Sequence, residues 1–133
     1  MRLWHKDLIP YLPRQQLLGQ WREVCAIQRN ITKNGTPNHI LVNKILDYPP
    51  EQFNRYAFMV CAEMQKRGYR VDWERFAQGR EKVLLADGRD LFKNWHTSRY
   101  LRQCLSNLQE KADCGAVPQD EWERITDEWP WFE

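Results

Sequence analysis

The stretch PEQFNRYAFMVCAEMQKRGY, residues 50–69, predicts the clearest helix of the chain and thereby its fold class. Pro50 suits the first turn of a helix, and Gly68 suits a left-handed cap at its end. Between them, apolar residues recur at the period of one helix face, along Phe53, Ala57, Val60, Cys61 and Met64. The stretch therefore predicts an amphipathic helix that buries this stripe.

The same period recurs on the N-terminal side of this helix. Residues 13–30 predict a long helix with its apolar positions at helical spacing, and TKNGTPN then breaks it. Asn38 is expected to cap a short helix over HILVNKIL, which DYPP ends.

The C-terminal side also predicts helices. Asp72 is expected to cap a short helix over residues 73–76, after which Gly79 and ADGRD predict turns and loop. A further helix is expected from Thr97 or Ser98 to about residue 114, and Pro118 is expected to open a last short one. The expected fold is therefore all-α, a compact single-domain helical bundle with loops over residues 1–133.

Composition narrows the class of protein. The chain has 133 residues, of which 42% are hydrophobic, so it can bury a core as one domain. Apolar runs such as YAFMVCA are too short to span a bilayer, and the N-terminus has no apolar signal core. We therefore expect a cytoplasmic monomer that does not bind membranes. The four cysteines form no C-x-x-C pair, which favours free thiols in a reducing compartment: Cys25, Cys61, Cys104 and Cys114.

Charge is unevenly distributed along the chain. Residues 1–33 carry six basic side chains against two acidic ones, whereas residues 119–133 carry six acidic side chains against one basic. A basic pole suits an anionic partner such as nucleic acid, because bound Lys and Arg displace condensed counterions. The alternative interpretation of such a charge run is a solvated helix face.

Four pieces of the sequence carry a family resemblance. They are the Met-Arg start, QQLLGQWRE with its adjacent Arg22 and Glu23, AEMQKRGYRV, and LRQCLSNLQEK followed by an aromatic-rich C-terminus. In these pieces the chain resembles the pyrimidine-dimer DNA glycosylase family of small helical DNA-repair enzymes, and within it the bacterial branch that begins MRLW. The resemblance implies a DNA glycosylase with abasic-site lyase activity that acts on double-stranded damaged DNA, with pyrimidine dimers among its candidate lesions. It implies no metal and no cofactor.

The resemblance also implies site residues. Bulky Arg2 is expected to leave Met1 in place, so the nucleophile is the amine of Met1, and Glu23 is the catalytic carboxylate. Arg22 is expected to hold a phosphate beside the lesion, while Arg2 and Gln16 occupy DNA-contacting positions, Gln16 in place of a histidine. Three further cations of the basic pole are expected phosphate contacts: Arg14, Arg29 and Lys33.

The proposed chemistry accounts for these residue types. An α-amine has an ordinary pKa of about 7.7–8.0, so a useful fraction is the neutral nucleophile at cellular pH. A nearby carboxylate can stabilise developing positive charge on the sugar and later move a proton. The three histidines lie far apart and lack the spacing of helical ligands, so a metal site is not expected at His5, His39 and His96.

Other interpretations stay open at the level of sequence. Trp4, Trp21 and Trp73 are expected in the core, whereas the aromatic C-terminus either packs on the domain or stacks on nucleotides. The basic pole also fits a nucleic-acid-binding module without catalysis. The acidic tail with its tryptophans fits a helical domain that binds another protein.

Overall fold

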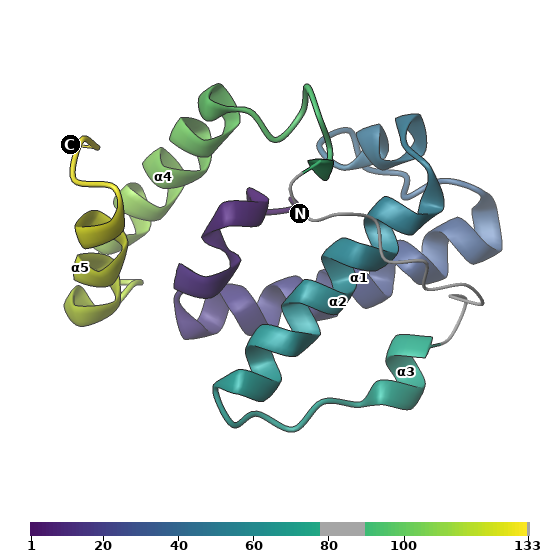
Figure 1. The fold of residues 1–133 in the computed structure, drawn as a ribbon, viewed down its shortest axis with the longest axis horizontal. Helices are drawn as coiled ribbons and strands as arrows, with labels where there is room; N and C mark the ends of the chain where they lie inside the picture. The colour runs from purple at the N-terminus through teal and green to yellow at the C-terminus, as the bar shows by residue number, and fades with distance from the viewer. Residues whose placement is uncertain (78–89, 133) are drawn as a thin grey trace.

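A computed structural model describes residues 1–77 and 90–132 and confirms the all-α fold class (Figure 1). Every regular element in these ranges is helical. The α-helices are α1 (Arg14–Asn34), α2 (Pro50–Lys66), α3 (Trp73–Ala77), α4 (Ser98–Asp113) and α5 (Gln119–Glu128), and two 3₁₀ helices complete the list, η1 (Lys6–Tyr11) and η2 (Asn43–Asp47). None of the helices in the described residues combines the length and apolar content needed to cross a membrane.

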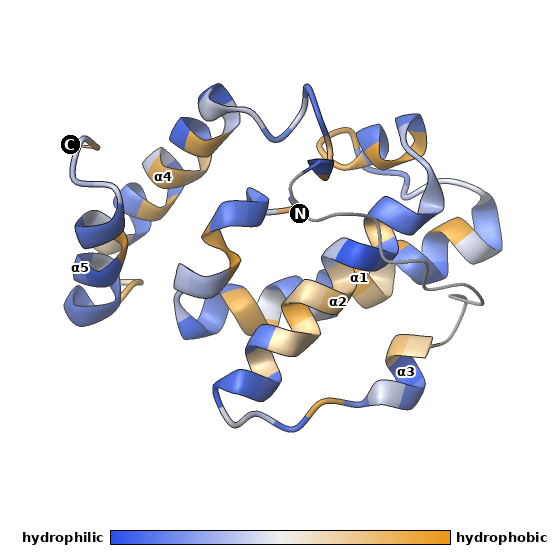
Figure 2. Cartoon of the chain, viewed as in Figure 1, coloured by the Kyte–Doolittle hydropathy of each residue, from blue (hydrophilic) through white to orange (hydrophobic). Residues whose placement is uncertain are grey.

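The centre of the fold is the pair α1 and α2, which pack against each other. η1 lies against α2 and α5, and α4 and α5 form a second packed pair (Figure 1). In Figure 2, apolar residues follow one stripe of α4 while the opposite stripe is hydrophilic. The largest fully buried side chains come from the N-terminal segment, η1, α1, α2, α4, α5 and the segment before α4, so one core joins both pairs.

Helix ends follow the capping signals, with two differences. Thr97 caps α4 by accepting from the Tyr100 N–H, and Gly68 has the expected positive φ of 85°. α1 continues four residues beyond the expected end, to Asn34, because the left-handed residue that terminates it is Gly35 with φ 76°. Lys33 therefore lies in the last turn of α1 rather than in a loop.

The predicted cap at Asn38 is wrong. η2 begins at Asn43 without a side-chain cap, and the preceding segment is a turn in which the Asn43 carboxamide accepts from the His39 N–H at 3.0 Å. By contrast, Asp72 does accept from the Arg75 N–H at 3.0 Å at the start of α3. The turns predicted around Gly79 lie outside the described residues.

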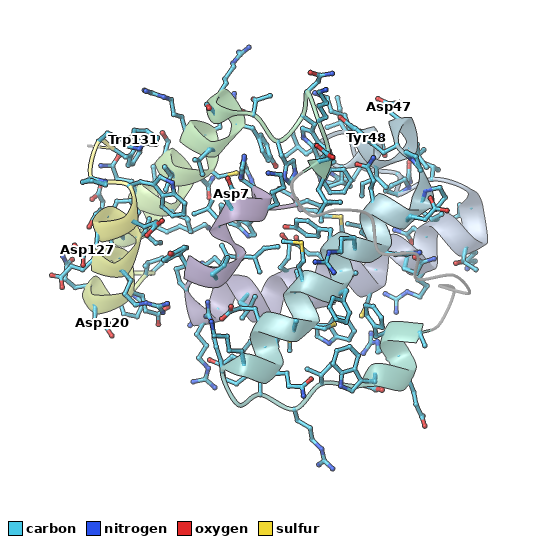
Figure 3. All side chains as sticks on the ribbon, viewed as in Figure 1. Asp7, Asp47, Tyr48, Asp120, Asp127 and Trp131 are labelled. Atoms are coloured by element: carbon cyan, nitrogen blue, oxygen red, sulfur yellow. The ribbon has the colours of Figure 1, made fainter. Side chains whose placement is uncertain are left out.

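The tryptophans divide differently from the prediction. Trp4 is buried and Trp21 packs partly buried against the core, but Trp73 is exposed, so its core assignment is wrong. α3 has five residues and turns one side toward the core, and the residue that it buries there is Phe76. At the C-terminus Trp129 and Phe132 pack against the domain, whereas Trp131 is exposed beneath the Arg102 guanidinium (Figure 3).

Candidate active site

The N-terminal segment is held along α1 by the side chain of Gln20. The Gln20 Oε1 atom accepts from the Trp4 N–H at 2.8 Å, and its Nε2 donates to the Arg2 carbonyl at 3.0 Å. Gln20 is buried, so these bonds form away from water and replace the backbone pairing that the extended segment lacks. One carboxamide thus fixes the course of residues 2–4.

Two tyrosines fix the same segment from other helices. Tyr56 of α2 donates its hydroxyl to the Trp4 carbonyl at 2.6 Å, and Tyr100 of α4 donates to the Leu3 carbonyl at 2.5 Å. Burial raises the pKa of both phenols, which keeps them protonated and able to donate. Side chains from three helices therefore converge on the backbone of residues 2–4.

The carboxylate of Glu23 lies at the start of this segment. Its Oε2 accepts from the Arg2 N–H at 3.4 Å and from Gln20 Nε2 at 3.2 Å. The Met1 amine is one residue from the Arg2 nitrogen, which bounds its distance from Glu23 Oε2 at about 7 Å. Met1 is 40% exposed and Glu23 is partly buried, so the start of the chain and this carboxylate are both within reach of solvent.

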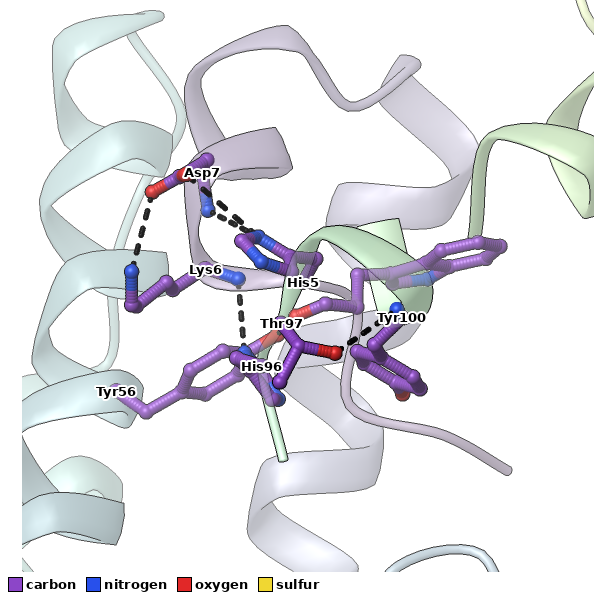
Figure 4. A network of polar contacts seen from close by, with 8 residues as sticks. His5, Lys6, Asp7, Tyr56, His96, Thr97 and Tyr100 are labelled. Atoms are coloured by element: carbon purple, nitrogen blue, oxygen red, sulfur yellow. Dashed lines mark hydrogen bonds and ion pairs between the residues drawn. The ribbon is translucent and has the colours of Figure 1, made fainter. Parts of the chain in front are cut away.

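A buried histidine pair, His5 and His96, lies where the N-terminal segment joins η1 (Figure 4). His96 Nδ1 accepts from the Lys6 N–H at 3.0 Å, and the ring of His5 stacks on His96 with centroids 5.2 Å apart. Burial is the largest cause that lowers the pKa of His96, and together with the electrostatic effects of His5 and Lys6 it brings the pKa to about 2. Burial likewise lowers the pKa of His5. Both rings are therefore neutral supports at physiological pH.

No candidate metal centre is found where the structure is described. Across residues 1–77 and 90–132, no group of three or more His, Cys, Asp or Glu side chains is arranged to hold an ion. His39 lies in the turn before η2, where its Nδ1 accepts from the Leu41 N–H at 3.3 Å. The three histidines thus take part in local and buried hydrogen bonding.

The predicted DNA contacts fall into two groups along α1. Arg22, Arg29 and Lys33 are exposed, and their spacing of seven and four residues puts them on one stripe of the helix. Glu23 lies one residue further round, about 100° away, which turns its carboxylate toward the N-terminal segment. Consecutive residues thus face different surroundings.

Arg14 and Gln16 lie at the other end of α1, near α5. The Arg14 N–H donates to Glu121 at 2.7 Å, and its guanidinium carbon lies 5.7 Å from the centroid of the Tyr69 ring. Gln16 shares the helix face of Glu23, about 10 Å along the axis, and its Oε1 is buried without a partner. Asp120 and Asp127 project from the neighbouring α5 (Figure 3), so the surroundings of Arg14 are more acidic than those of Arg22.

Comparison with known families addresses the part of the chain that carries this geometry. A family model described as pyrimidine dimer DNA glycosylase matches residues 1–76, more than half of the chain. The chain belongs to the pyrimidine dimer DNA glycosylase family. This confirms the family that the sequence resembled. No curated protein and no solved structure matches the chain.

The family match contains most of the site and ends before the rest of it. Met1, Arg2, Gln20, Glu23 and Tyr56 lie inside residues 1–76. The tyrosine and histidine contributed by the segment from 96 to 100 lie outside them. The part of the chain that matches the family therefore contains the Met1 amine, the Glu23 carboxylate and the Gln20 side chain that holds residues 2–4. Tyr100 and His96, which also hold the N-terminal part of the chain, come from outside the matched residues.

Sequence reasoning missed Gln20, Tyr56 and Tyr100. A signal for Gln20 existed, because a polar residue three positions before Glu23 lies on the same helix face, among buried neighbours. Nothing in the local sequence marks the two tyrosines, since their partners are backbone carbonyls 52 and 97 residues away.

Proposed function

We propose that this protein is a DNA glycosylase with abasic-site lyase activity that acts on double-stranded damaged DNA, including DNA with pyrimidine dimers. The observation that carries the proposal is the meeting of Glu23 and the N-terminal segment, where Oε2 accepts from the Arg2 N–H at 3.4 Å. Family membership supports the glycosylase part, since the matched residues include both groups.

In the proposed reaction the Met1 amine attacks C1′ of the damaged nucleotide. The glycosidic bond breaks, and the base leaves with the bonding electrons. The nitrogen then loses its protons as the sugar ring opens, which gives an imine between the chain and C1′, with a proton on O4′. An α-amine reaches its neutral form at lower pH than a lysine, and the exposure of Met1 gives a nucleotide access to it.

The Glu23 carboxylate serves two steps of the proposed reaction. Its negative charge stabilises the positive charge that develops on the sugar as the base departs. The carboxylate then takes a proton from C2′ of the imine, and the C3′–O bond breaks so that the phosphate leaves on the 3′ side. Both hydrogen bonds that Glu23 forms within the described residues reach Oε2, so in the proposed reaction Oε1 is the oxygen that acts on the substrate.

The side chains proposed to contact DNA phosphates in this reaction are mainly the cations near the amine. Arg22 is adjacent to Glu23 and exposed, so it can hold the phosphate that flanks the reacting sugar. Arg29 and Lys33 continue the same stripe, and Arg2 lies beside the amine itself. Arg14 and Gln16 extend the proposed contact surface to the start of α1.

Trapping with borohydride tests the proposal. Duplex DNA with an abasic site or a pyrimidine dimer is incubated with protein and borohydride, which reduces an imine to a stable amine bond. Intact-mass measurement should show a covalent adduct, and peptide mapping should place it on the N-terminal residue. Absence of an adduct on every damaged duplex, with salt-sensitive DNA binding retained, would instead support the binding module without catalysis.

A blocked N-terminus provides the sharpest control. Extending the chain by a few residues before Met1 should abolish trapping while DNA affinity changes little, because the amine is removed from Glu23. Lys6→Arg should still trap, since Lys6 Nζ lies against Asp7 at 3.4 Å. Persistent trapping by the extended protein would move the nucleophile to a lysine, with Lys6 and Lys33 the first to test.

The same mass measurement resolves which residue supplies the amine. The nitrogen that lies 3.4 Å from Glu23 belongs to Arg2, one residue beyond Met1. If Met1 is kept, the nucleophile is the Met1 amine, which lies one residue before the nitrogen that contacts Glu23. If Met1 is removed, the nucleophile is the Arg2 amine, which is the nitrogen that contacts Glu23. The proposal predicts an adduct mass that includes Met1.

A further inference from the structure

A pocket of about 370 Å³ opens beside the N-terminal segment, and of its lining residues only Arg2 has a part in the proposed chemistry. Its lining comes from three parts of the chain: Arg2, the segment around η2, and residues from just before α4 into its first turns. Figure 1 shows the segment that leads into α4 close to the N-terminus. Tyr48 ties two of these parts together by donating its hydroxyl to the Lys93 carbonyl at 2.6 Å. The pocket is therefore built from three separate stretches of the chain.

The charge of the pocket is positive. Arg2, Lys44 and Arg99 line it, and no acidic side chain is among its described lining residues. None of these three side chains forms an ion pair with another residue in the described ranges. The Arg2 side chain contacts three uncharged groups: Cys104 Sγ, 3.8 Å from Nη1, the Trp4 ring, with its centroid 5.4 Å from the guanidinium carbon, and the side chain of Tyr100. Such a site favours an anionic oxygen group such as a phosphodiester.

Two large apolar side chains stand exposed on the wall of this pocket. Ile40 is 85% exposed and Leu41 is 50% exposed, and both line it. The turn that carries them is ordered by hydrogen bonds, since His39 Nδ1 accepts from the Leu41 N–H and Asn43 Oδ1 accepts from the His39 N–H. Water is an unfavourable environment for adjacent exposed aliphatic side chains, so this turn is suited to an apolar partner.

We propose that the Ile40–Leu41 turn inserts into the DNA base stack beside the reacting nucleotide, while Arg2, Lys44 and Arg99 hold a phosphate of the same strand in the pocket. The proposal rests on the proposed function for the identity of the DNA. Apolar side chains of this kind separate adjacent base pairs and kink a duplex, which exposes the sugar of the nucleotide between them. The turn and the Met1 amine then act on one sugar from neighbouring positions, since Arg2 belongs to both sites.

Charge complementarity selects DNA as the occupant. An apolar protein segment on this turn would leave the three cations around it without counter-charges, whereas a duplex presents stacked bases and phosphates a few ångströms apart. The aromatic residues of the C-terminus do not compete for this role. Trp129 and Phe132 pack against the domain, and Trp131 lies against Arg102.

Fluorescence of 2-aminopurine measures the insertion without any catalysis. The base is placed next to a tetrahydrofuran abasic analogue in a duplex, which cannot form an imine, and it brightens when it is unstacked. Wild-type protein should raise the fluorescence on binding, and an Ile40→Ser/Leu41→Ser double variant should lose most of that rise. Leu46→Ser is the matched control, because Leu46 is also 50% exposed but does not line the pocket.

Strand cleavage gives an independent readout on natural abasic sites. A single strand has no paired base stack to open, so the ratio of duplex to single-strand cleavage isolates the insertion. This ratio should fall at least about tenfold in the double variant and stay within about twofold for Leu46→Ser. Lys44→Ala/Arg99→Ala should lower the salt dependence of duplex binding by about two units, one for each lost phosphate contact.

The outcomes separate this inference from the proposed function. If the double variant matches Leu46→Ser in fluorescence and in the cleavage ratio, insertion is overturned, and wild-type trapping would still support the glycosylase. If wild-type protein fails to trap on any damaged duplex yet brightens 2-aminopurine through Ile40 and Leu41, the catalytic proposal fails and the insertion stands. A wild-type protein that binds the duplex without any fluorescence rise also overturns the insertion.

Discussion

Arg22 and Glu23 are neighbours in α1, yet their surroundings differ in burial, bonding and charge. Glu23 is partly buried and accepts hydrogen bonds from Arg2 and Gln20, within a network that also includes Tyr56. Arg22 is exposed on a stripe shared with Arg29 and Lys33. Consecutive helix residues point about 100° apart, so a single helix presents a carboxylate to the N-terminal segment and a row of cations to solvent.

The two faces of α1 depend on different physical interactions. The inward face is the side of α1 that carries Gln20 and Glu23, together with the N-terminal segment that these residues hold. Its stability depends on buried hydrogen bonds and on neutral histidines, so substitution and pH should change that stability more than salt does. The outward face is the exposed stripe of Arg22, Arg29 and Lys33. Because these charges are exposed, salt should screen their interaction with DNA.

Glu23→Gln should have the largest effect. The glutamine keeps an oxygen acceptor for the Arg2 and Gln20 donors but loses the negative charge and the ability to take a proton. Strand cleavage of abasic duplex DNA should fall by about 10²–10⁴-fold, with DNA affinity and unfolding temperature nearly unchanged. Glu110→Gln, at an exposed position of α4, is the control. Cleavage by Glu23→Gln within a few fold of wild type would remove Glu23 from the chemistry.

Gln20→Leu should destabilise the inward face. The leucine fills similar space but leaves the buried Trp4 N–H without its acceptor, which costs about 1–3 kcal/mol of unfolding free energy. Urea unfolding followed by tryptophan fluorescence measures this loss. The exposed residue Gln15 provides the reference, since Gln15→Leu should shift stability by less than about 0.5 kcal/mol. Equal stability of the two variants would show that the clamp on residues 2–4 contributes nothing.

Mild acid should weaken the inward face through His96. Its folded-state pKa is about 2, below its ordinary value, so below pH 6.5 the unfolded chain binds a proton that the folded chain excludes. Stability is therefore fully present above about pH 6.5 and is lost as the pH falls. The unfolding free energy should drop by about 1 kcal/mol between pH 7 and pH 5.5, and His5 adds to the same direction.

A His96→Gln variant isolates this contribution. Glutamine offers an acceptor for the Lys6 N–H but does not titrate, so its unfolding free energy should depend less on pH over this interval. If the wild type and the variant change in parallel, the histidine pair is not the source of the acid sensitivity.

Arg22→Ala should have the smallest effect, and only on the outward face. Binding to damaged and undamaged duplexes should weaken equally, and the slope of log affinity against log salt should fall by about one unit. The exposed Arg70, beyond the end of α2, supplies the control variant Arg70→Ala, which should leave the slope unchanged. An unchanged slope in Arg22→Ala would show that this arginine contacts no phosphate.

Much of the helical pattern was predictable because its causes are local. Pro50, Gly68 and Asp72 act on backbone groups within a few residues, and their predicted roles agree with the structure. The helix expected from Thr97 or Ser98 begins at Ser98. Asn38 failed because η2 begins five residues later, after a turn held by the Asn43 side chain. A cap residue in the sequence marks a turn of some kind, and neighbouring side chains decide which helix follows it.

Core membership was less predictable than helix position. Trp73 has the hydrophobicity of a core residue, but α3 spans only five residues and turns Phe76, not Trp73, inward. Hydrophobicity favours burial, yet the surface available for burial depends on where the helix lies relative to the others.

The sequence by itself determined the all-α class, the ends of most helices and the adjacency of Arg22 and Glu23, because periodicity and capping act over a few residues. Only the tertiary structure decided what Glu23 faces. Gln20 lies 16 residues from Trp4, Tyr56 donates to a carbonyl 52 residues away, and Tyr100 donates to one 97 residues away. These partners come into contact only when α1, α2 and α4 pack on one core. The cation-lined pocket of Arg2, Lys44 and Arg99 has the same origin, since no local pattern relates its residues.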